Sequence, residues 1–445
     1  MPVSEGSRRI EEIRAALPRG GVFAEKEWRF SPEPFPLSPD EVALLRRLGP
    51  ALQRFQQVCD NLYRRSVKGS LPDWIARYVD EGKPSSVVAL GRAAGHREVF
   101  PHVIRPDLIL TEDGFVLTEI DSVPGGIGLT AWLNQVYARW DTDGALVGGA
   151  SAMIEGFHRI LPDSGNILVS EESRDYRPEM VWLARQLNER YGKTGTWHTL
   201  RAENFPFRDK AVYRFFELFD LPNIPGAQDL ARHAATGQLI VTPPFKAYLE
   251  EKLWLALFHL APLRRIWIRE LRESNFRFLA QVIPYGWMVD PAPLPHHAVL
   301  PRLEIHEWDE LKLFSQSQRE LVLKRSGFSE LAWGSRSVRI GSDLSQRDWA
   351  QAVERALCDF PAQPWIMQEF HRGRLVEHPY WDEDAGEMRM LSGRVRLCPY
   401  YMPGVDREMK LCGVLATICP ADKKVLHGMR EAILVPCCES RNAGG

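Results

Sequence analysis

Four charged residues, Arg105, Asp107, Glu119 and Asp121, lie within one short and otherwise apolar stretch of this 445-residue chain. Three carboxylates beside a single arginine repel one another unless something neutralises them. Mg²⁺ takes oxygen ligands and is commonly held by one or two carboxylates together with nucleotide phosphates. These residue types therefore suggest a magnesium site, while a salt-bridged face exposed to solvent is the alternative interpretation of the same stretch.

A β-hairpin is needed to bring these four side chains together. The sequence predicts strands at residues 104–111 and 115–121, joined by a three-residue tip that ends in Gly114. Such a tip, with glycine in the left-handed conformation, is typical of a bulged hairpin. The pairs in that register are Asp107 with Glu119 and Arg105 with Asp121. Because strand side chains alternate between faces, all four groups then emerge on one side, whereas a two-residue tip would turn Asp107 to the other face.

Composition excludes several classes of protein. The chain has 56 basic and 58 acidic residues and no basic run, which disfavours a nucleic-acid partner. The first thirty residues lack the apolar core of a signal peptide, and no stretch approaches the roughly 20 apolar residues of a membrane span. Seven cysteines without a CxxC pair favour buried free thiols in a reducing compartment. We therefore expect a soluble, cytoplasmic protein with no membrane partner.

The texture of the sequence changes along the chain. Residues 1–84 are expected to be mostly helical, with a capping signature at Ser38-Pro-Asp-Glu41. Short apolar strands at 167–170, 196–200 and 211–216, with an amphipathic helix at 178–191, predict a parallel α/β unit. No GxGxxG follows the first of these strands, so nothing there indicates a dinucleotide site.

Three further segments could bind a nucleotide. Lys324 ends an apolar strand and precedes a loop with glycine and serine, so its ammonium group and the backbone of the loop could meet phosphates. Gln368, Glu369 and Phe370 end another short strand, the kind of position that lines an adenine slot. Lys252 lies in an expected helix after a Pro-Pro break, with Lys246 as a second choice. Taken singly, an ordinary hairpin loop explains the Lys324 segment equally well. A polar strand end explains Gln368 to Phe370 better, and a solvated or salt-bridged helix lysine is the default interpretation of Lys252.

The order of these segments resembles that of the circularly permuted ATP-grasp enzymes, and in particular of glutathionylspermidine synthase-like proteins. The resemblance covers about residues 95–400 and rests on Arg-x-Asp with Glu-x-Asp, then Lys252, then Val-Leu-Lys324, then Gln368-Glu-Phe. In ordinary ATP-grasp chains the lysines precede the metal ligands, whereas here the charged hairpin leads. Asp121 stands where the family usually has asparagine, and the loop after Lys324 is less rich in glycine than usual.

The resemblance implies an α+β fold, a circularly permuted ATP-grasp with a Rossmann-like layer and a helical N-terminal region. The implied divisions are a helical region at 1–84, a metal-binding part at 85–164, the Rossmann-like layer at 165–236, and a part with the ATP-binding lysines, loop and hinge at 237–445.

The implied roles use the residues singled out above. Lys252 and Lys324 would hold the α- and β-phosphates of ATP, and Gln368, Glu369 and Phe370 would line the adenine slot. Asp107, Glu119 and Asp121 would carry Mg²⁺, and the catalytic Arg105 would neutralise charge on the transferred phosphoryl group.

The implied activity is ATP-dependent ligation of a carboxylate to an amine, forming an amide or peptide bond through an acyl phosphate, with small molecules or peptides as substrates. The alternatives are a nucleotide-binding protein without ligase activity, an ATP-dependent phosphotransferase, and a scaffold that does not use ATP.

Overall fold

The computed structural model describes residues 5–18, 23, 27–140, 144–161, 164–193, 195–205, 211–295, 297–332, 336–428 and 430–440. This part of the chain is a mixed α/β protein that contains an eight-stranded sheet and two four-stranded sheets. None of its helices combines the length and the apolar character that crossing a membrane requires.

The chain divides into two compact units, each assembled from segments that are distant in sequence. Unit 1 comprises 1–53, 94–244 and 372–445, and unit 2 comprises 54–93 and 245–371. These limits do not follow the four consecutive divisions expected from the sequence, because strands from the N-terminal region, the hairpin and the C-terminal region pair within one sheet. Pairing across such distances in sequence is invisible to local patterns.

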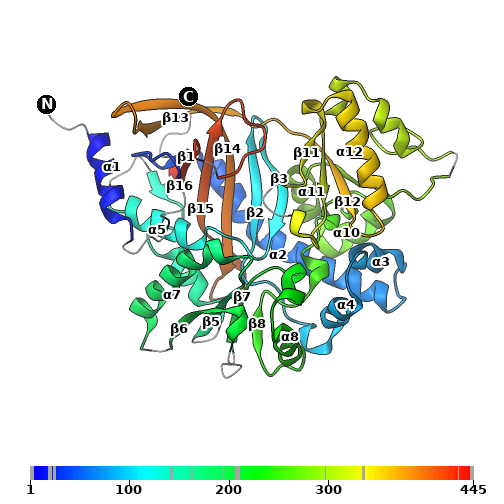
Figure 1. Ribbon diagram of the computed structural model, residues 1–445, viewed down its shortest axis with the longest axis horizontal. Helices are drawn as coiled ribbons and strands as arrows, with labels where there is room; N and C mark the ends of the chain where they lie inside the picture. The colour runs from blue at the N-terminus through cyan, green and yellow to red at the C-terminus, as the bar shows by residue number, and fades with distance from the viewer. Residues whose placement is uncertain are drawn as a thin grey trace. The chain divides into compact units, whose positions relative to one another are not determined.

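Unit 1 is built on the eight-stranded sheet (Figure 1). Its strands run in the order β1-β16-β15-β14-β2-β3, while β13 pairs with β14 and β4 pairs with β16. Their bounds are β1 Phe35–Leu37, β2 Arg105–Thr111, β3 Gly114–Asp121, β4 Gly144–Leu146, β13 Leu375–Asp382, β14 Glu387–Pro403, β15 Met409–Pro420 and β16 Ile433–Ser440.

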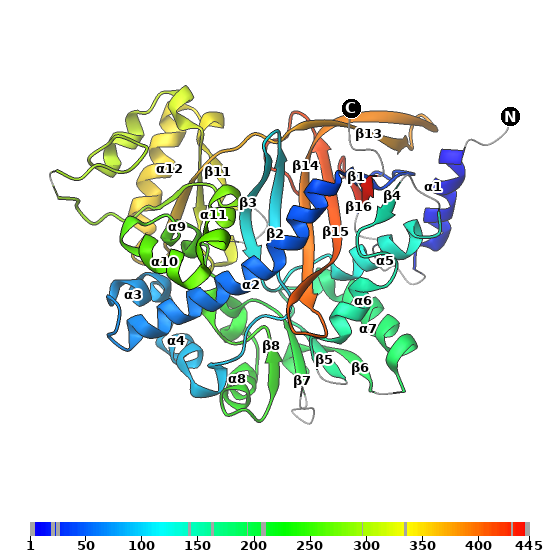
Figure 2. The same ribbon diagram turned by 180° about the vertical axis from the view of Figure 1, so that it is seen from behind.

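The first half of helix α2 (Pro39–Val67) covers one face of this sheet (Figure 2). The helix starts as the sequence predicted, since Ser38 and Glu41 form a capping box in which each side chain accepts from the other's backbone N–H, at 3.2 and 2.8 Å. Gly49 lies directly against the ring of Tyr401, whose hydroxyl donates to the carbonyl of Leu45 at 2.7 Å. This close contact fixes which side of β14 faces the helix.

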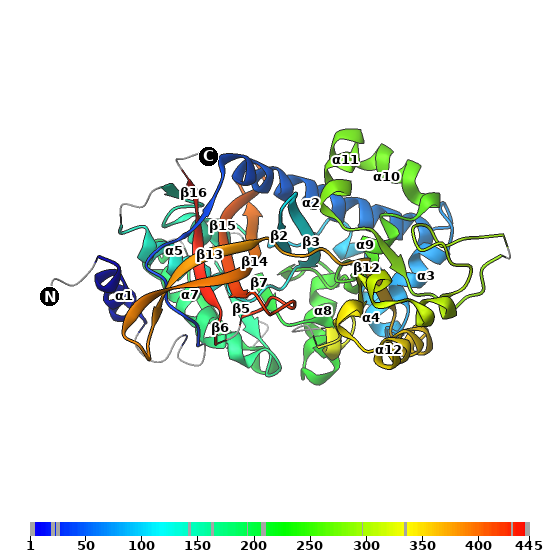
Figure 3. The same ribbon diagram turned by 90° about the horizontal axis from the view of Figure 1, so that it is seen from above.

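A parallel sheet completes unit 1, in the order β6-β5-β7-β8, and confirms the expected α/β unit. Helix α7 lies beside β6 (Figure 3). The bounds are β5 Gly165–Val169, β6 Trp197–Arg201, β7 Ala211–Phe215 and β8 Ile240–Thr242, with helices α1 Glu5–Ala16, α5 Ile127–Tyr137, α6 Ala152–His158, α7 Arg177–Tyr191 and α8 Ala227–Ala235.

Unit 2 is built on an antiparallel sheet in the order β11-β10-β12-β9. Helix α12 covers one face through Trp349 and Val353, which join a core with Leu323 and Met367. The bounds are β9 Gly286–Met288, β10 Leu321–Arg325, β11 Arg339–Ile340 and β12 Trp365–Glu369, with helices α3 Trp74–Asp80, α4 Ser85–Arg92, α9 Leu253–Leu257, α10 Arg264–Leu271, α11 Glu273–Val282 and α12 Gln346–Asp359.

Candidate functional site

The charged hairpin has the predicted pairs, with Asp107 opposite Glu119 and Arg105 opposite Asp121. The reason differs from the one expected. The tip is a two-residue loop, because Thr111 pairs with Gly114, and this shorter tip alone would have turned Asp107 away from Glu119. An irregularity next to Asp107 leaves Thr118 as an extra residue in β3 and restores the register.

The four side chains gather on the face opposite the one that α2 covers. Arg105 bridges two carboxylates, with its Nη2 atom 3.1 Å from Oδ1 of Asp107 and 2.9 Å from Oδ2 of Asp121. The arginine and Asp107 are mostly buried, and Asp121 is 23% exposed. Burial strengthens the attraction within an ion pair and makes separating the two charges costly in free energy. The side chains of this cluster are therefore held in one arrangement.

Two residues that sequence analysis did not assign complete this face from β14. Nη1 of Arg396 lies 3.1 Å from Oδ2 of Asp107, and the thiol of Cys398 donates to Oδ1 of the same carboxylate at 3.5 Å. Burial raises the pKa of the Cys398 thiol to about 11, so it stays protonated and is not a nucleophile at neutral pH. Alternation of Arg394, Arg396 and Cys398 along the strand was the available signal, but the pairing of β14 with β2 could not be read locally.

The carboxyl group of Asp121 has a raised pKa. Burial raises the pKa of Asp121 to about 6; the guanidinium of Arg105 opposes this, while the charges of Glu119 and Asp107 add to it. The hairpin therefore carries more negative charge than Arg105 can neutralise.

These carboxylates are better suited to a magnesium ion that is also bound by nucleotide phosphates than to one bound by protein ligands alone. Among the described residues no group of three or more His, Cys, Asp or Glu side chains is arranged to hold a metal ion. Asp107 has two arginine partners, Arg105 and Arg396, and Asp121 shares Arg105 with it, so the three carboxylates of the hairpin face two arginines. One or two carboxylates are what Mg²⁺ uses when nucleotide phosphates provide further ligands, so the donor set fits that mode in kind.

In unit 2, Lys324 lies near the end of strand β10, as expected. Its side chain is buried, and its ammonium group donates to Oε1 of Gln368 at 2.9 Å. Leu323 and Met367 face α12, so alternation places Lys324 and Gln368 on the opposite face of the sheet. Gly286, directly across from Gln368, approaches Ala256 of α9, since a Cβ atom there would lie 3.8 Å from the Cα atom of Ala256. The face that carries Lys324 is thus the one next to α9.

Lys252 precedes this helix and is not inside it, which corrects the expectation of a helix lysine. Its ammonium group donates to the carbonyl of Ala332 at 3.2 Å, in the loop after β10. The second choice, Lys246, is fully buried and pairs with Asp60 at 2.8 Å. Lys252 is therefore the lysine that lies next to the segment following Lys324, while convergence of the two lysines on one cleft stays a prediction.

The end of β12 is more occupied than the sequence suggested. The backbone N–H groups of Glu369 and Phe370 donate to the carbonyls of Tyr285 and Glu320, each at 2.9 Å. The Glu369 carboxylate pairs with Arg302 at 2.8 Å. Among the described residues, Nε2 of Gln368 is a buried donor without a partner. A base at this strand end would therefore meet the amide of Gln368 more readily than backbone donors.

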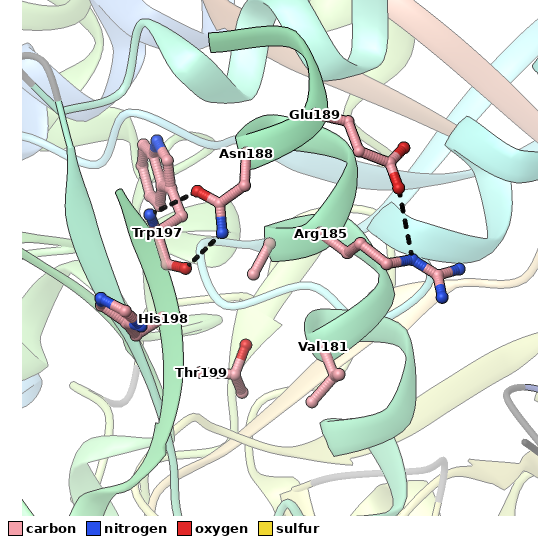
Figure 4. A pocket seen from close by; sticks show the side chains of 8 residues that line it. Val181, Arg185, Asn188, Glu189, Trp197, His198 and Thr199 are labelled. Carbon is pink, nitrogen blue, oxygen red and sulfur yellow. Dashed lines mark hydrogen bonds and ion pairs between the residues drawn. The ribbon is translucent and has the colours of Figure 1, made fainter. Parts of the chain in front are cut away.

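A separate open groove in unit 1 lies between α7 and β6 (Figure 4). Asn188 ties the helix to the strand through two hydrogen bonds with the backbone of Trp197, at 2.7 and 2.8 Å. The charges in its lining, Arg185 and Glu189, are an i,i+4 pair. The groove holds none of the predicted site residues.

Comparison with known proteins supports the fold. Neither a protein-family model nor a curated protein matches the sequence. A glutathione synthetase-like effector from Globodera pallida, solved in its apo form, is similar over 97% of this chain and 96% of its own, with a TM-score of 0.52 and 10% sequence identity. A candidate gamma-glutamylcysteine synthetase from Methylobacillus flagellatus is similar over 86% of each chain, with a TM-score of 0.39 and 11% identity. The first likeness is consistent with an ATP-grasp-like fold.

Proposed function

We propose that this protein is an ATP-dependent carboxylate–amine ligase of the ATP-grasp type. The observation that carries the proposal is the hairpin face on which Arg105 bridges Asp107 and Asp121 while Glu119 adds further negative charge. A fold like that of a glutathione synthetase-like protein supports it, and so does the chain order, in which β2 and β3 precede α9 and β10 as in a circular permutation. Kinship with glutathionylspermidine synthase-like proteins belongs to the same proposal.

In the proposed reaction a substrate carboxylate oxygen attacks the γ-phosphorus of ATP, and ADP leaves. The amine nitrogen of the second substrate then attacks the acyl carbon, the C–N bond forms, and inorganic phosphate leaves. Phosphoryl transfer of this kind is catalysed by positioning and charge stabilisation and needs no protein nucleophile. The protonated thiol of Cys398 agrees with that requirement.

The residues divide the work by chemistry. Lys252 and Lys324 would offer their ammonium groups to the phosphates, and Arg105 would stabilise the charge on the transferred phosphoryl group. The strand end at Gln368, Glu369 and Phe370 would take the base, with Nε2 of Gln368 as its donor.

Asp107, Glu119 and Asp121 would hold Mg²⁺, with Asp107 also oriented by Arg396. When bound, the ion would supply positive charge to the phosphate oxygens.

The test has two stages. Purified protein is first assayed for stabilisation by ATP with Mg²⁺, and then for ADP release over a panel of small carboxylates paired with amines. The product of an active pair should have the summed mass of both substrates minus water. A phosphorylated product without an amide would instead indicate a phosphotransferase, ATP binding without turnover would indicate a nucleotide-binding protein, and no response to ATP would indicate a scaffold. Lys423 is an exposed lysine paired with Asp422, so Lys423→Met is the matched control for substitutions of Lys252 and Lys324.

A further inference from the structure

A buried carboxylate fastens the loop after β10 to the segment before α9. Oε2 of Glu251 accepts hydrogen bonds from the backbone N–H of Gly327, at 3.0 Å, and from the hydroxyl of Ser326. Oε1 of the same carboxylate forms an ion pair with Lys83. The side chains of Lys83 and Glu251 are each only 1% exposed. Breaking one partner of such a pair would leave an uncompensated buried charge.

The residues on both sides of Lys252 take part in this junction. Ser326 donates to Glu251 and accepts from the backbone N–H of Leu253 at 3.1 Å. Gly327 lies directly against the backbone of Glu250, because a Cβ atom at Gly327 would come within 1.9 Å of that carbonyl oxygen. Only glycine allows this approach. The segment before α9 and the loop after β10 are thus joined at several adjacent points.

This arrangement changes the interpretation of the start of the loop, Ser326 and Gly327. The sequence predicts that the backbone of the loop meets phosphates, but the backbone N–H of Gly327 donates to Glu251, and so does the hydroxyl of Ser326. These two donors are satisfied by the protein's own carboxylate, while Gly334, the other glycine of the expected loop, lies outside the described residues. Ser326 and Gly327, at the start of the loop, therefore hold neighbouring groups in place.

We propose that Glu251, together with Lys83, is a positioning residue for nucleotide binding. It fixes the backbone on either side of Lys252 to Ser326, which lies two residues after Lys324, so that the two lysines keep one mutual geometry. This inference rests on the proposed function, because it assigns phosphate binding to these lysines. Displacement of a binding group by about 1 Å can cost on the order of 10²-fold in rate, so such a junction has a measurable effect.

The test measures ATP affinity in Glu251→Gln, Glu251→Ala and Ser326→Ala, with Lys423→Met as the control and circular dichroism as the check of folding. Each site variant, measured at a temperature at which it is folded, should bind ATP about tenfold more weakly than the wild-type protein, the effect of weakening one charge-assisted contact with the phosphates. The control should bind as the wild type does. Ser326→Ala removes one hydroxyl and keeps the ion pair, so the idea remains testable if the Glu251 variants do not fold.

Chemical rescue separates positioning from general destabilisation. Formate should restore ATP affinity in Glu251→Ala by occupying the place of the missing carboxylate, whereas chloride at equal ionic strength should not. Folded variants that bind ATP with wild-type affinity would overturn the inference while leaving the proposed function intact. Absence of ATP binding by the wild-type protein would instead overturn the proposed function, and this inference with it.

Discussion

In the hairpin, the fold disfavours the charged form of Asp121. Its pKa of about 6 lies above the ordinary value of 3.8, mainly because it is buried beside other carboxylates. Between about pH 4 and pH 6 the folded protein therefore binds a proton at this site that the unfolded chain has released. Stability from this group is greatest below that window and is lost as the pH rises through it.

Asp121→Asn should remove this pH dependence. The neutral amide keeps an oxygen and cannot be repelled by Glu119 and Asp107, so the melting temperature at pH 7 should rise above that of the wild-type protein. Melting curves recorded from pH 4 to pH 7 measure the effect, and Asp113→Asn at the exposed hairpin tip is the control. Identical pH dependence in the wild-type protein and Asp121→Asn would contradict the electrostatic account.

Glu119→Ala should separate catalysis from stability. If Glu119 contributes to Mg²⁺ binding, the rate of ADP release should fall on the order of 10²–10³-fold, as when one preorganised electrostatic contact is lost. Stability without ligand should stay level or rise, because one of three mutually repelling carboxylates is gone. The measurement pairs steady-state ADP release with the melting temperature, and full activity would rule out the assigned role.

Lys324→Ala is expected to act on ground-state binding as well as on turnover, because its positive charge would meet the phosphates in both states. Its loss also removes the partner of Gln368, whose amide would then be less well oriented. Isothermal titration with ATP and Mg²⁺ should show an increase in Kd, and the assay should show a lower kcat. An unchanged Kd would mean that this lysine holds Gln368 for packing alone.

At the scale of elements, the hairpin shows which features local sequence determines. The clustering of Arg105, Asp107, Glu119 and Asp121 was predicted correctly because alternation along strands needs only the pairing register. The length of the tip was predicted wrongly, because a two-residue tip with a bulge at Thr118 gives the same register at Asp107 as a three-residue tip. A change in tip length can be compensated by a bulge in one strand. A sequence can therefore specify which residues pair without revealing the tip length or the position of the bulge.

Deletions in β3 distinguish the bulge from the regular part of the strand. Removing Thr118 lets Glu119 take the regular place opposite Asp107, so both faces are kept and the loss is about 1 kcal/mol, for its hydrogen bond to the Asp107 carbonyl. Removing Ile120 moves Asp121 to the place opposite Pro106, on the other face of the strand, where a carboxylate replaces an apolar side chain, so the loss should exceed that at Thr118. Urea denaturation of both variants measures the difference, and equal losses would exclude a bulge at Thr118.

At the scale of the whole molecule, sequence patterns identified segments and missed the contacts that unite them. Lys83 and Glu251 lie 168 positions apart, and each alone reads as an ordinary surface residue. Arg396 meets Asp107 across 289 positions. Burial of a charged side chain can be predicted only when its ion-pair partner is known. Partners this distant in sequence are determined by the tertiary fold. The composition of the two units from interleaved segments follows from the same kind of long-range contact.

The proposed roles give each unit a separate response to nucleotide. In unit 1, backbone amide hydrogen exchange in the hairpin strands β2 and β3 should become slower when Mg²⁺ and ATP are added, because the carboxylates would be neutralised. In unit 2, exchange should also slow in α9, which follows Lys252, and in β10, which contains Lys324. Binding of ATP at 100 times its Kd would stabilise the folded state by about 2.7 kcal/mol, enough to slow exchange in these segments. Hydrogen exchange with mass spectrometry measures them independently, and Lys324→Ala should lose the effect in unit 2. Slower exchange confined to the groove between α7 and β6 would place the nucleotide away from both groups and contradict the assignment.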